Sequence, residues 1–457
     1  MAKNRAKNPY EGVNVRVKSL EDLYVKRKML RDFKEGEDAI KADSKYYLPK
    51  FPTESTGMYT DRVNNSYLFN ILAIIIQRIS TKPLNKQIQI IAKNADGSEN
   101  TELVNTMYNF NNEGNTLLDF ARDAFAESLW YNQGYAIVEG ENVAMIDVDD
   151  ILQVEVSKGE LLYFRFKDVV VQRNGFKEEE IQVIREFEKI NDKVYLTIYV
   201  ETEAKSDVFE ITVDHDEYFI NEIPVVRFYP FGTKCEFNPD LYFKPVASMQ
   251  KAIFKQDSDI TNMLGIAAVP FLFFKGVDIN DDEEPLIISA FNALSSNLDF
   301  SDIKYVEATC SSLNVLISER NNMLDKAQSL TIDLLSKNMA NVTATSSLID
   351  EANNNAMLSC AAVALQEFLE KIIDLKYKFK LGVAVPTFNI SLTTDFSIRA
   401  TVEELNFLTQ CKTLGVISSE DLYVEGQRRG IFDTTKTYEE VMANKDKETS
   451  SSSFFPE

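Results

Sequence analysis

The sequence predicts an α+β protein with more than one structural region. Its 457 residues exceed the size that one hydrophobic core usually serves, and 44% hydrophobic with 26% charged residues is typical of a folded chain. Apolar residues recur at helical spacing over several long stretches, whereas residues 135–226 alternate and are rich in β-branched side chains. Two long helices that bracket a small insertion are expected after this β-rich region.

The first part of the chain reads as a basic arm followed by helices. Residues 1–18 carry five Lys and Arg side chains with little apolar content, which indicates a mobile arm. Helical patterning begins near Ser19, and an apolar helix is expected over 67–79, ending before Pro83. A further helix is expected over about 117–130. No stretch reaches the ~20 apolar residues that a membrane span needs.

The second part of the chain predicts two long helices, an insertion and a third helix. One face of 241–264 is apolar, with Val246, Met249, Ile253, Ile260 and Met263. A compact α/β insertion follows over 265–317, then a helix over 318–338 and a polar loop over 339–346.

A capping-box pattern at Ser347 and Asp350 predicts a third helix that extends to about Phe379. Alternation over 388–392 suggests one more strand, which could rejoin the β-rich region. Capping patterns at Thr401 and Ser418 predict short helices, and the tail 444–457 is expected to be disordered.

The charge balance argues against tight binding of nucleic acid. With 49 Lys and Arg against 71 Asp and Glu, the net charge is −22, and phosphate binding depends on clustered cations. Such a surface repels a duplex, which suits a conduit along which DNA slides. The four cysteines, at 235, 310, 360 and 411, show no metal-ligand spacing, so we expect them to be buried free thiols. This pattern suits a protein that is made in a reducing cytosol.

Sequence motifs of catalysis are missing from the chain. It holds no glycine-rich phosphate loop ending in Lys and Ser or Thr, no GxSxG and no HExxH. The one histidine, His215, is expected in a solvated acidic turn, and the acidic cluster near Asp278 lacks the spacing of a calcium loop. We therefore expect no enzyme activity, no cofactor and no metal, although counting carboxylates leaves a two-acid hydrolase open.

The order of these predicted elements resembles that of portal proteins of tailed bacteriophages. Residues 46–52 (YYLPKFP), 59–82 and 120–138 (FARDAFAESLWYNQGYAIV) look like the N-terminal wing of a portal. Residues 341–352 (NVTATSSLIDEA) look like its tunnel loop and the start of the helix behind it. The similarity extends from about Leu20 to Phe432, and it rests on the order of motifs that are individually degenerate.

The resemblance implies a portal fold with a wing, two stem helices, a small α/β clip, a tunnel loop and a helical crown. The regions would be a wing at 19–240, a first stem helix at 241–264, a clip at 265–317, a second stem helix at 318–338, a tunnel loop at 339–346, a wing helix and returning strand at 347–395, and a crown at 396–443.

The resemblance also implies a function. Portals form a closed ring of twelve copies at one capsid vertex, the channel through which double-stranded DNA is packaged and ejected without sequence specificity. The partners implied are the terminase large subunit, then a head–tail adaptor or tail protein, and the major capsid or scaffolding protein. The protein would be made in the host cytoplasm and reside in the virion. Another phage structural component, such as a tail adaptor or vertex protein, is the second interpretation.

Candidate functional residues follow from the portal interpretation. The tunnel loop would present Asn341, Thr343 and Thr345 to DNA phosphates. Lys326 and Lys337 would add limited positive rings, or would each pair with a carboxylate on the helix surface. The acidic residues of the clip would form a docking patch for the motor. The alternative interpretation is that they belong to a solvated loop without a partner. The acidic residues are Asp278, Asp281, Asp282, Glu283 and Glu284.

Overall fold

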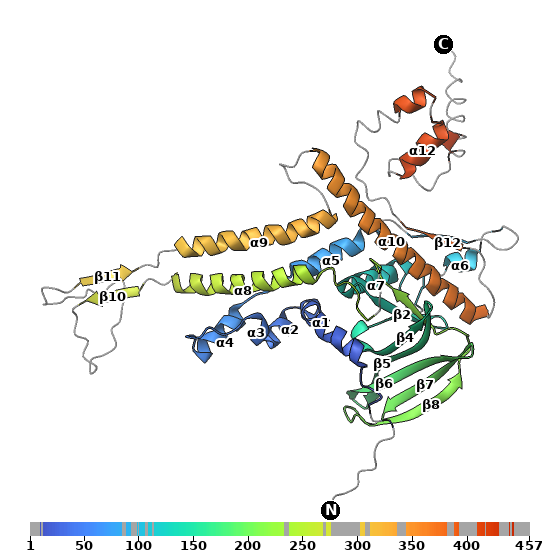
Figure 1. The fold of residues 1–457 in the computed structure, drawn as a ribbon, viewed down its shortest axis with the longest axis horizontal. Coiled ribbons are helices and arrows are strands. Elements are labelled where there is room, and N and C mark those ends of the chain that lie inside the picture. Colours follow the sequence, from blue (N-terminus) through green and yellow to red (C-terminus); the bar gives the residue numbers. More distant parts are fainter. Residues whose placement is uncertain are drawn as a thin grey trace, which may run out of the picture. The chain divides into compact units, whose positions relative to one another are not determined.

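The computed structural model describes residues 10, 12–84, 88–92, 98, 100–105, 108–111, 114–232, 237–267, 271–275, 302–306, 311–335, 344–381, 388–392, 409–415, 417–428, 438 and 441–442. The predicted α+β class is confirmed, with 49% helix and 25% strand. The chain forms two compact units (Figure 1). We call Val25–Ile75 with Leu241–Thr331 the long-helix unit, and Met1–Tyr24, Ile76–Asp240 and Ile332–Glu457 the sheet unit. The predicted wing at 19–240 is thus divided between the two.

The long-helix unit combines short N-terminal helices with two long ones. Its elements are α2 (Glu37–Ala42), α3 (Ser44–Tyr47), α4 (Thr56–Asn65), α8 (Lys244–Ala267) and α9 (Ser311–Leu335), with the strands β10 (Phe271–Lys275) and β11 (Asp302–Val306) between the last two in sequence. The helix α1 (Lys18–Glu35) begins in the sheet unit and ends here, where Gly36 takes a φ of 95° that an L side chain rarely adopts. The helix α5 (Ile71–Thr81) begins here.

The helix α5 starts four residues later than predicted, and Asn70 explains why. Its Oδ1 accepts a hydrogen bond from the Ala73 N–H at 3.1 Å, and its Nδ2 donates to the Phe33 carbonyl at 2.7 Å. Asn70 therefore caps the helix and ties it to α1. The apolar face of Ile71, Leu72, Ile75, Ile76 and Ile79 is buried as expected.

The sheet unit contains two antiparallel sheets that share a core. A three-stranded sheet has the order β3-β2-β9, from Asn142–Ile146, Gly134–Glu139 and Val225–Phe228. A short turn, η1 (Val148–Asp150), leads to a five-stranded meander of β4 (Ile151–Ser157), β5 (Glu160–Asn174), β6 (Lys177–Ile190), β7 (Lys193–Glu201) and β8 (Phe209–Glu217). Tyr135 of β2 meets Phe164 of β5 with ring centroids 5.5 Å apart in the shared core.

The helix α7 (Leu117–Tyr131) agrees with the prediction at 117–130. Thr116 and Asp119 form a capping box at its start, and Asn132 ends it in the left-handed conformation. The chain then turns back so closely that a Cβ at Gly134 would lie 2.0 Å from the Ser128 Oγ. Glycine is therefore required where β2 passes α7.

The helix α10 (Ala344–Leu381) packs on β9 and β2 of the same unit. It starts before the predicted Ser347, so residues 344–346 are helical and not part of a loop. A β-branched residue such as Thr345 costs a helix only a fraction of a kcal/mol, which is too little to end it. The strand β12 (Phe388–Ser391) pairs with β1 (Gln89–Ala92), near the short helix α6 (Thr101–Asn105), and does not join the β-rich sheets.

The predicted mobile arm over 1–18 is wrong for its second half. Tyr10 stacks edge-on against Tyr199 at 5.6 Å, Val13 is buried, and the Val17 N–H donates to the Leu152 carbonyl at 2.9 Å. The side chains of Tyr10 and Val13 pack on one cluster of sheet residues, and Val17 packs on the core that the two sheets share. This burial of apolar surface outweighs the charges of the segment. Residues 1–9 and the predicted tail at 444–457 lie outside the described residues. Of the predicted crown at 396–443, the described residues are 409–415, 417–428 with α12 (Ser419–Arg428), 438 and 441–442.

None of the helices in the described part of the chain is long and apolar enough to cross a membrane.

Candidate functional site

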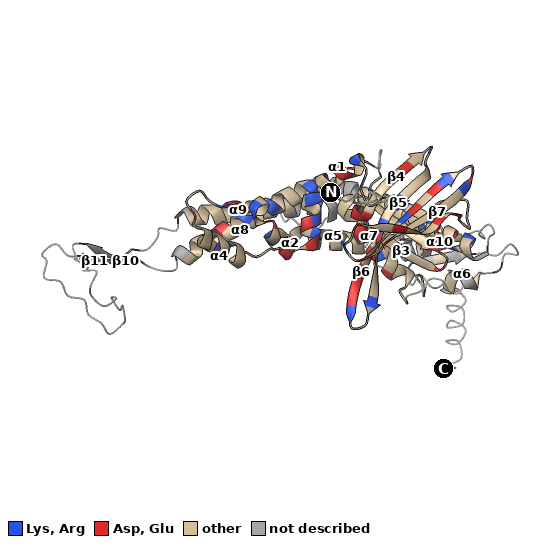
Figure 2. Cartoon of the chain, turned by 90° about the horizontal axis from the view of Figure 1, so that it is seen from below, with Lys and Arg blue, Asp and Glu red and all other residues tan. Residues whose placement is uncertain are grey.

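The two long helices α8 and α9 lie alongside each other (Figures 1 and 2). They correspond to the predicted stem helices at 241–264 and 318–338, although α9 begins seven residues earlier than expected. One ion pair joins them: the Arg320 Nε donates to the Asp257 Oδ1 at 2.7 Å. The Asp257 side chain is only 5% exposed, so this carboxylate depends on its partner.

The helix α8 is held against the N-terminal helices by a side-chain amide. The Gln250 Oε1 accepts from the Ile71 N–H at 3.0 Å, and its Nε2 donates to the Phe69 carbonyl at 2.6 Å. One α8 side chain thus satisfies the backbone at the start of α5. The Lys251 Nζ lies 3.3 Å from the centroid of the Tyr46 ring, a cation–π contact that adds a second link.

A buried arginine provides the third link between α8 and the N-terminal helices. Arg62 of α4 makes two hydrogen bonds to Glu54, at 2.8 and 2.9 Å, and one to the Pro49 carbonyl at 3.0 Å. The Arg62 side chain is 1% exposed, and its hydrogen bond holds the pKa of the Glu54 carboxyl below the usual value. Asp259 of α8 lies 3.6 Å from the Arg62 Nη1. Burial raises the pKa of Asp259, while Arg62 acts in the opposite direction.

Only two of the predicted DNA-facing residues fall in the described chain. Lys326 lies exposed on α9, and Thr345 lies in the first turn of α10. Asn341, Thr343 and Lys337 lie outside the described residues, as do Asp278, Asp281, Asp282, Glu283 and Glu284 of the predicted docking patch. The proposed roles of these residues therefore stay predictions, because eight of the ten lie outside the described part of the chain.

The Asp257–Arg320 pair was missed at the level of sequence, although a signal for it exists. Asp257 falls four residues after Ile253 and three before Ile260, within the apolar face predicted for this helix. A carboxylate at such a position requires a partner from another element.

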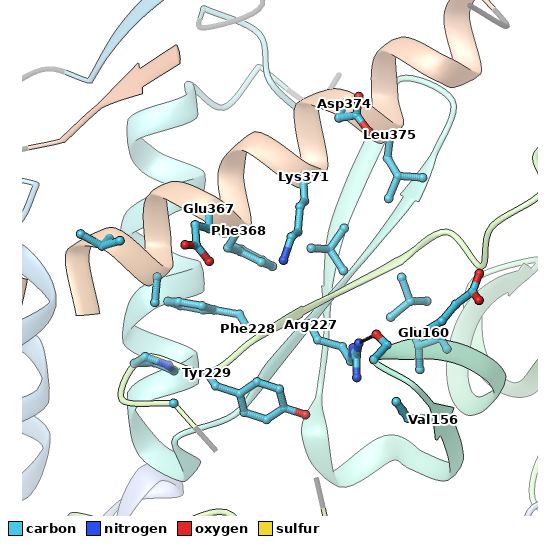
Figure 3. Close-up of a pocket in the computed structure, with 18 of the residues that line it drawn as sticks. Val156, Glu160, Arg227, Phe228, Tyr229, Glu367, Phe368, Lys371, Asp374 and Leu375 are labelled. Carbon is cyan, nitrogen blue, oxygen red and sulfur yellow. Dashed lines mark hydrogen bonds between the residues drawn. The ribbon is translucent and has the colours of Figure 1, made fainter. Parts of the chain in front are cut away.

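The sheet unit holds a wide groove of about 1430 Å³ between α10, β9 and the turn that joins β4 to β5 (Figure 3). Its floor is aromatic, with Phe228 and Phe368 stacked at 4.8 Å. Lys371 extends from α10 into the space above β9, and Arg227 donates to the Gly159 carbonyl (Figure 3). Two lining carboxylates, Glu222 and Asp374, are both engaged by Lys378 of α10, at 2.7 and 2.6 Å.

Two single-residue expectations differ from the structure. Cys360 was expected to be buried, but it is exposed where α10 lines the groove. His215 lies in β8 and not in a turn, with its ring stacked on Tyr195 at 4.2 Å. Among the residues that the structure describes, no three Asp, Glu, His or Cys side chains gather as metal ligands would.

Comparison with known families matches residues 245–380 to a domain of unknown function (DUF4055). The match runs from α8 to α10 and covers less than a third of the chain. No curated protein matches.

Two solved structures resemble the chain in outline. One, "Neck of empty GTA particle computed with C6 symmetry", matches with a TM-score of 0.46 and 12% identity over 84% of this chain and 96% of that one. The other, "Virion of native gene transfer agent (GTA) particle", matches with a TM-score of 0.43 and 11% identity over 80% and 90%. At these values the likeness does not establish a shared function.

Proposed function

We propose that the chain is the portal subunit of a tailed phage, which forms a ring of about twelve copies around a DNA channel. The observation that carries the proposal is the pair of long helices. By their residue counts α8 and α9 are about 36 and 38 Å long, and the partly buried Asp257–Arg320 pair joins them. The antiparallel strands β10 and β11 lie between them in sequence, and the 38-residue α10 follows. This is the stem, clip, stem and wing-helix order of the portal resemblance.

The surface of the long-helix unit supports contacts between copies. Several large apolar side chains on it are more than a third exposed in the single copy, and a contact with a neighbouring copy would bury them. They are Val25, Tyr46, Phe51, Met58, Tyr67, Phe69, Ile74, Tyr242, Leu264 and Val315. A ring covers such a surface by placing one face of each copy on a different face of the next.

The charge of the chain supports passage of DNA in preference to tight binding. The net charge is −22, and the Arg320 cation of α9 is already neutralised by Asp257. Our candidates for weak contacts with phosphates are still Lys326, Lys337, Asn341, Thr343 and Thr345. Residues 265–317 would dock the terminase and later an adaptor, and the sheet unit would meet capsid or scaffolding protein at the portal vertex. The role proposed is structural and not enzymatic.

Native mass spectrometry of the purified protein tests the proposal. We expect one dominant species of about twelve copies. Val315, which is 68% exposed on α9, offers a variant: Val315→Glu should lower the fraction of assembled protein at least about tenfold, since it places a charge in a contact. Asn314→Glu adds the same charge at the neighbouring exposed polar position and is the control. A wild-type protein that stays monomeric at all concentrations would reject the portal role.

A further inference from the structure

The hairpin of β5 and β6 extends beyond the strands on either side of it. β4 pairs with β5 only as far as Phe166, and β7 pairs with β6 only from Val183 onward. Beyond these points Val169–Asn174 pairs with Lys177–Gln182, and among the described strands with no other. We call residues 168–183 the ribbon. Figure 2 shows the end of β6 reaching past the other strands of the sheet.

The ribbon exposes apolar side chains on a regular edge. Val169, Val170 and Val171 are 44%, 40% and 57% exposed, and Phe176 at the tip is fully exposed. The pairing of β5 with β6 runs without a bulge, and no proline interrupts it. A two-stranded ribbon is marginally stable alone in water, and an open edge of β-branched residues is a template for another strand.

The strand β8, which forms one edge of the same sheet, is protected in the usual ways. Asp214, His215, Asp216 and Glu217 of β8 are all exposed, so charge lines the last strand. The pairing of β7 with β8 is irregular near Ile198, which disrupts a regular edge. The sheet therefore protects β8 from strand addition and leaves the ribbon open.

The two edges of the ribbon carry opposite charge. On β5, Lys167 and Arg173 flank the valines, and the one carboxylate within the ribbon part of this strand, Asp168, is ion-paired with Arg185 at 3.0 Å. On β6, three consecutive glutamates at 178–180 follow Lys177. The β5 edge of one copy is thus complementary to the β6 edge of another.

The antiparallel ladder would continue if two ribbons lay side by side and pointed the same way. β5 and β6 are antiparallel to each other, so β6 of one copy would also be antiparallel to β5 of the next. Within the ribbon Arg173 lies opposite Glu178. Ribbons at equal height would repeat that pairing, with Arg173 of the neighbouring copy facing Glu178.

We propose that the ribbon pairs edge to edge with the ribbon of a second copy of the chain, β6 of one copy against β5 of the next. The contact joins two different edges, so it repeats from copy to copy and closes only in a ring. It rests on the ring of the proposed function. The backbone N–H and C=O groups along the open edges then form hydrogen bonds between copies, and neighbouring copies cover the three valines.

Hydrogen–deuterium exchange of the assembled protein and of its dissociated subunits tests the contact directly. We expect amides of residues 168–183 to exchange roughly tenfold more slowly, or slower still, in the assembly. A second test replaces residues 169–182 by Asn-Gly, which joins Asp168 to Val183, a directly opposed pair. The shortened protein should keep its sheets and dissociate at a several-fold higher concentration.

A charge reversal gives the matched comparison. Glu178→Arg with Glu180→Arg should weaken assembly, adding Arg173→Glu should restore part of it, and Asp214→Arg with Asp216→Arg on the protected β8 edge should leave it unchanged. Rings whose ribbon exchanges as fast as in free subunits would overturn this contact and leave the portal role standing. Protection only inside capsids would also overturn it, because the partner would then be the shell protein. A wild-type protein that forms no ring would overturn both.

Discussion

Removing Arg320 should cost the long-helix unit much of the stability that joins α8 to α9. The variant Arg320→Met leaves the Asp257 carboxylate, 5% exposed, without the donor that lies 2.7 Å from it. Breaking a fully buried pair in this way typically costs about 3–5 kcal/mol. The Arg320 side chain is 26% exposed, so water reaches part of the pair, and we expect about 2–3 kcal/mol.

The assay is urea unfolding at one fixed protein concentration, followed by far-ultraviolet circular dichroism, in a double-mutant cycle with Asp257→Leu. The double variant has no unpaired charge and should recover to within about 1 kcal/mol of the wild type. The coupling free energy should therefore exceed about 1 kcal/mol. A loss below about 0.5 kcal/mol for Arg320→Met, or additive single effects, would refute the reasoning that this pair joins the helices.

Three further outcomes are expected. Arg62 lowers the pKa of Glu54, so the ionised carboxylate stabilises the folded protein fully above pH 4.5, its usual pKa, and this stabilisation is lost as the pH falls below that value. The melting temperature should therefore drop below pH 4.5, and it should drop less in Glu54→Gln. An equal acid sensitivity in that variant would contradict this. Gly134→Ala should cost about 1–3 kcal/mol in chemical denaturation because its Cβ would meet Ser128, whereas a neutral result would mean that β2 can move. Phe368→Ala should cost about 3–5 kcal/mol, and a smaller loss would show that the stack on Phe228 collapses without a cavity.

The long periodic elements were predictable from the sequence, and the reason is physical. A helix such as α8 buries one stripe over 24 residues, so its apolar spacing survives local irregularities. The capping box at Thr116 and the glycine at Gly36 act within a few residues, and so does the Ser418 hydroxyl, which accepts from the Asp421 N–H at 3.0 Å. Such local chemistry is visible in a sequence.

Features that depend on partners distant in sequence were not predictable. The N-terminal segment looks like a basic arm in the sequence, because its few apolar residues pack against parts of the chain that lie far away in sequence. Tyr10 and Val13 pack on one cluster of sheet residues and Val17 on another. The partner of β12 is a strand almost 300 residues earlier, and no spacing in the sequence names it. The ribbon was likewise hidden, because alternation predicts a strand but not where its neighbours end.

The two helices of the candidate site were predicted from the sequence, whereas the ion pair that joins them was not. Spacing indicated two helices around an insertion, but it gave no reason to single out Asp257 and Arg320, which are 63 residues apart. The groove of the sheet unit was not predicted for the same reason, since its lining residues come from three distant segments, within 156–161, within 222–232 together with Phe237, and within 359–375.

Cryo-electron microscopy of the purified, full-length protein tests the central claim most directly. The account predicts closed rings of about twelve copies with an open axial channel. Class averages that show only single copies, or two-fold dimers without a channel, would contradict it.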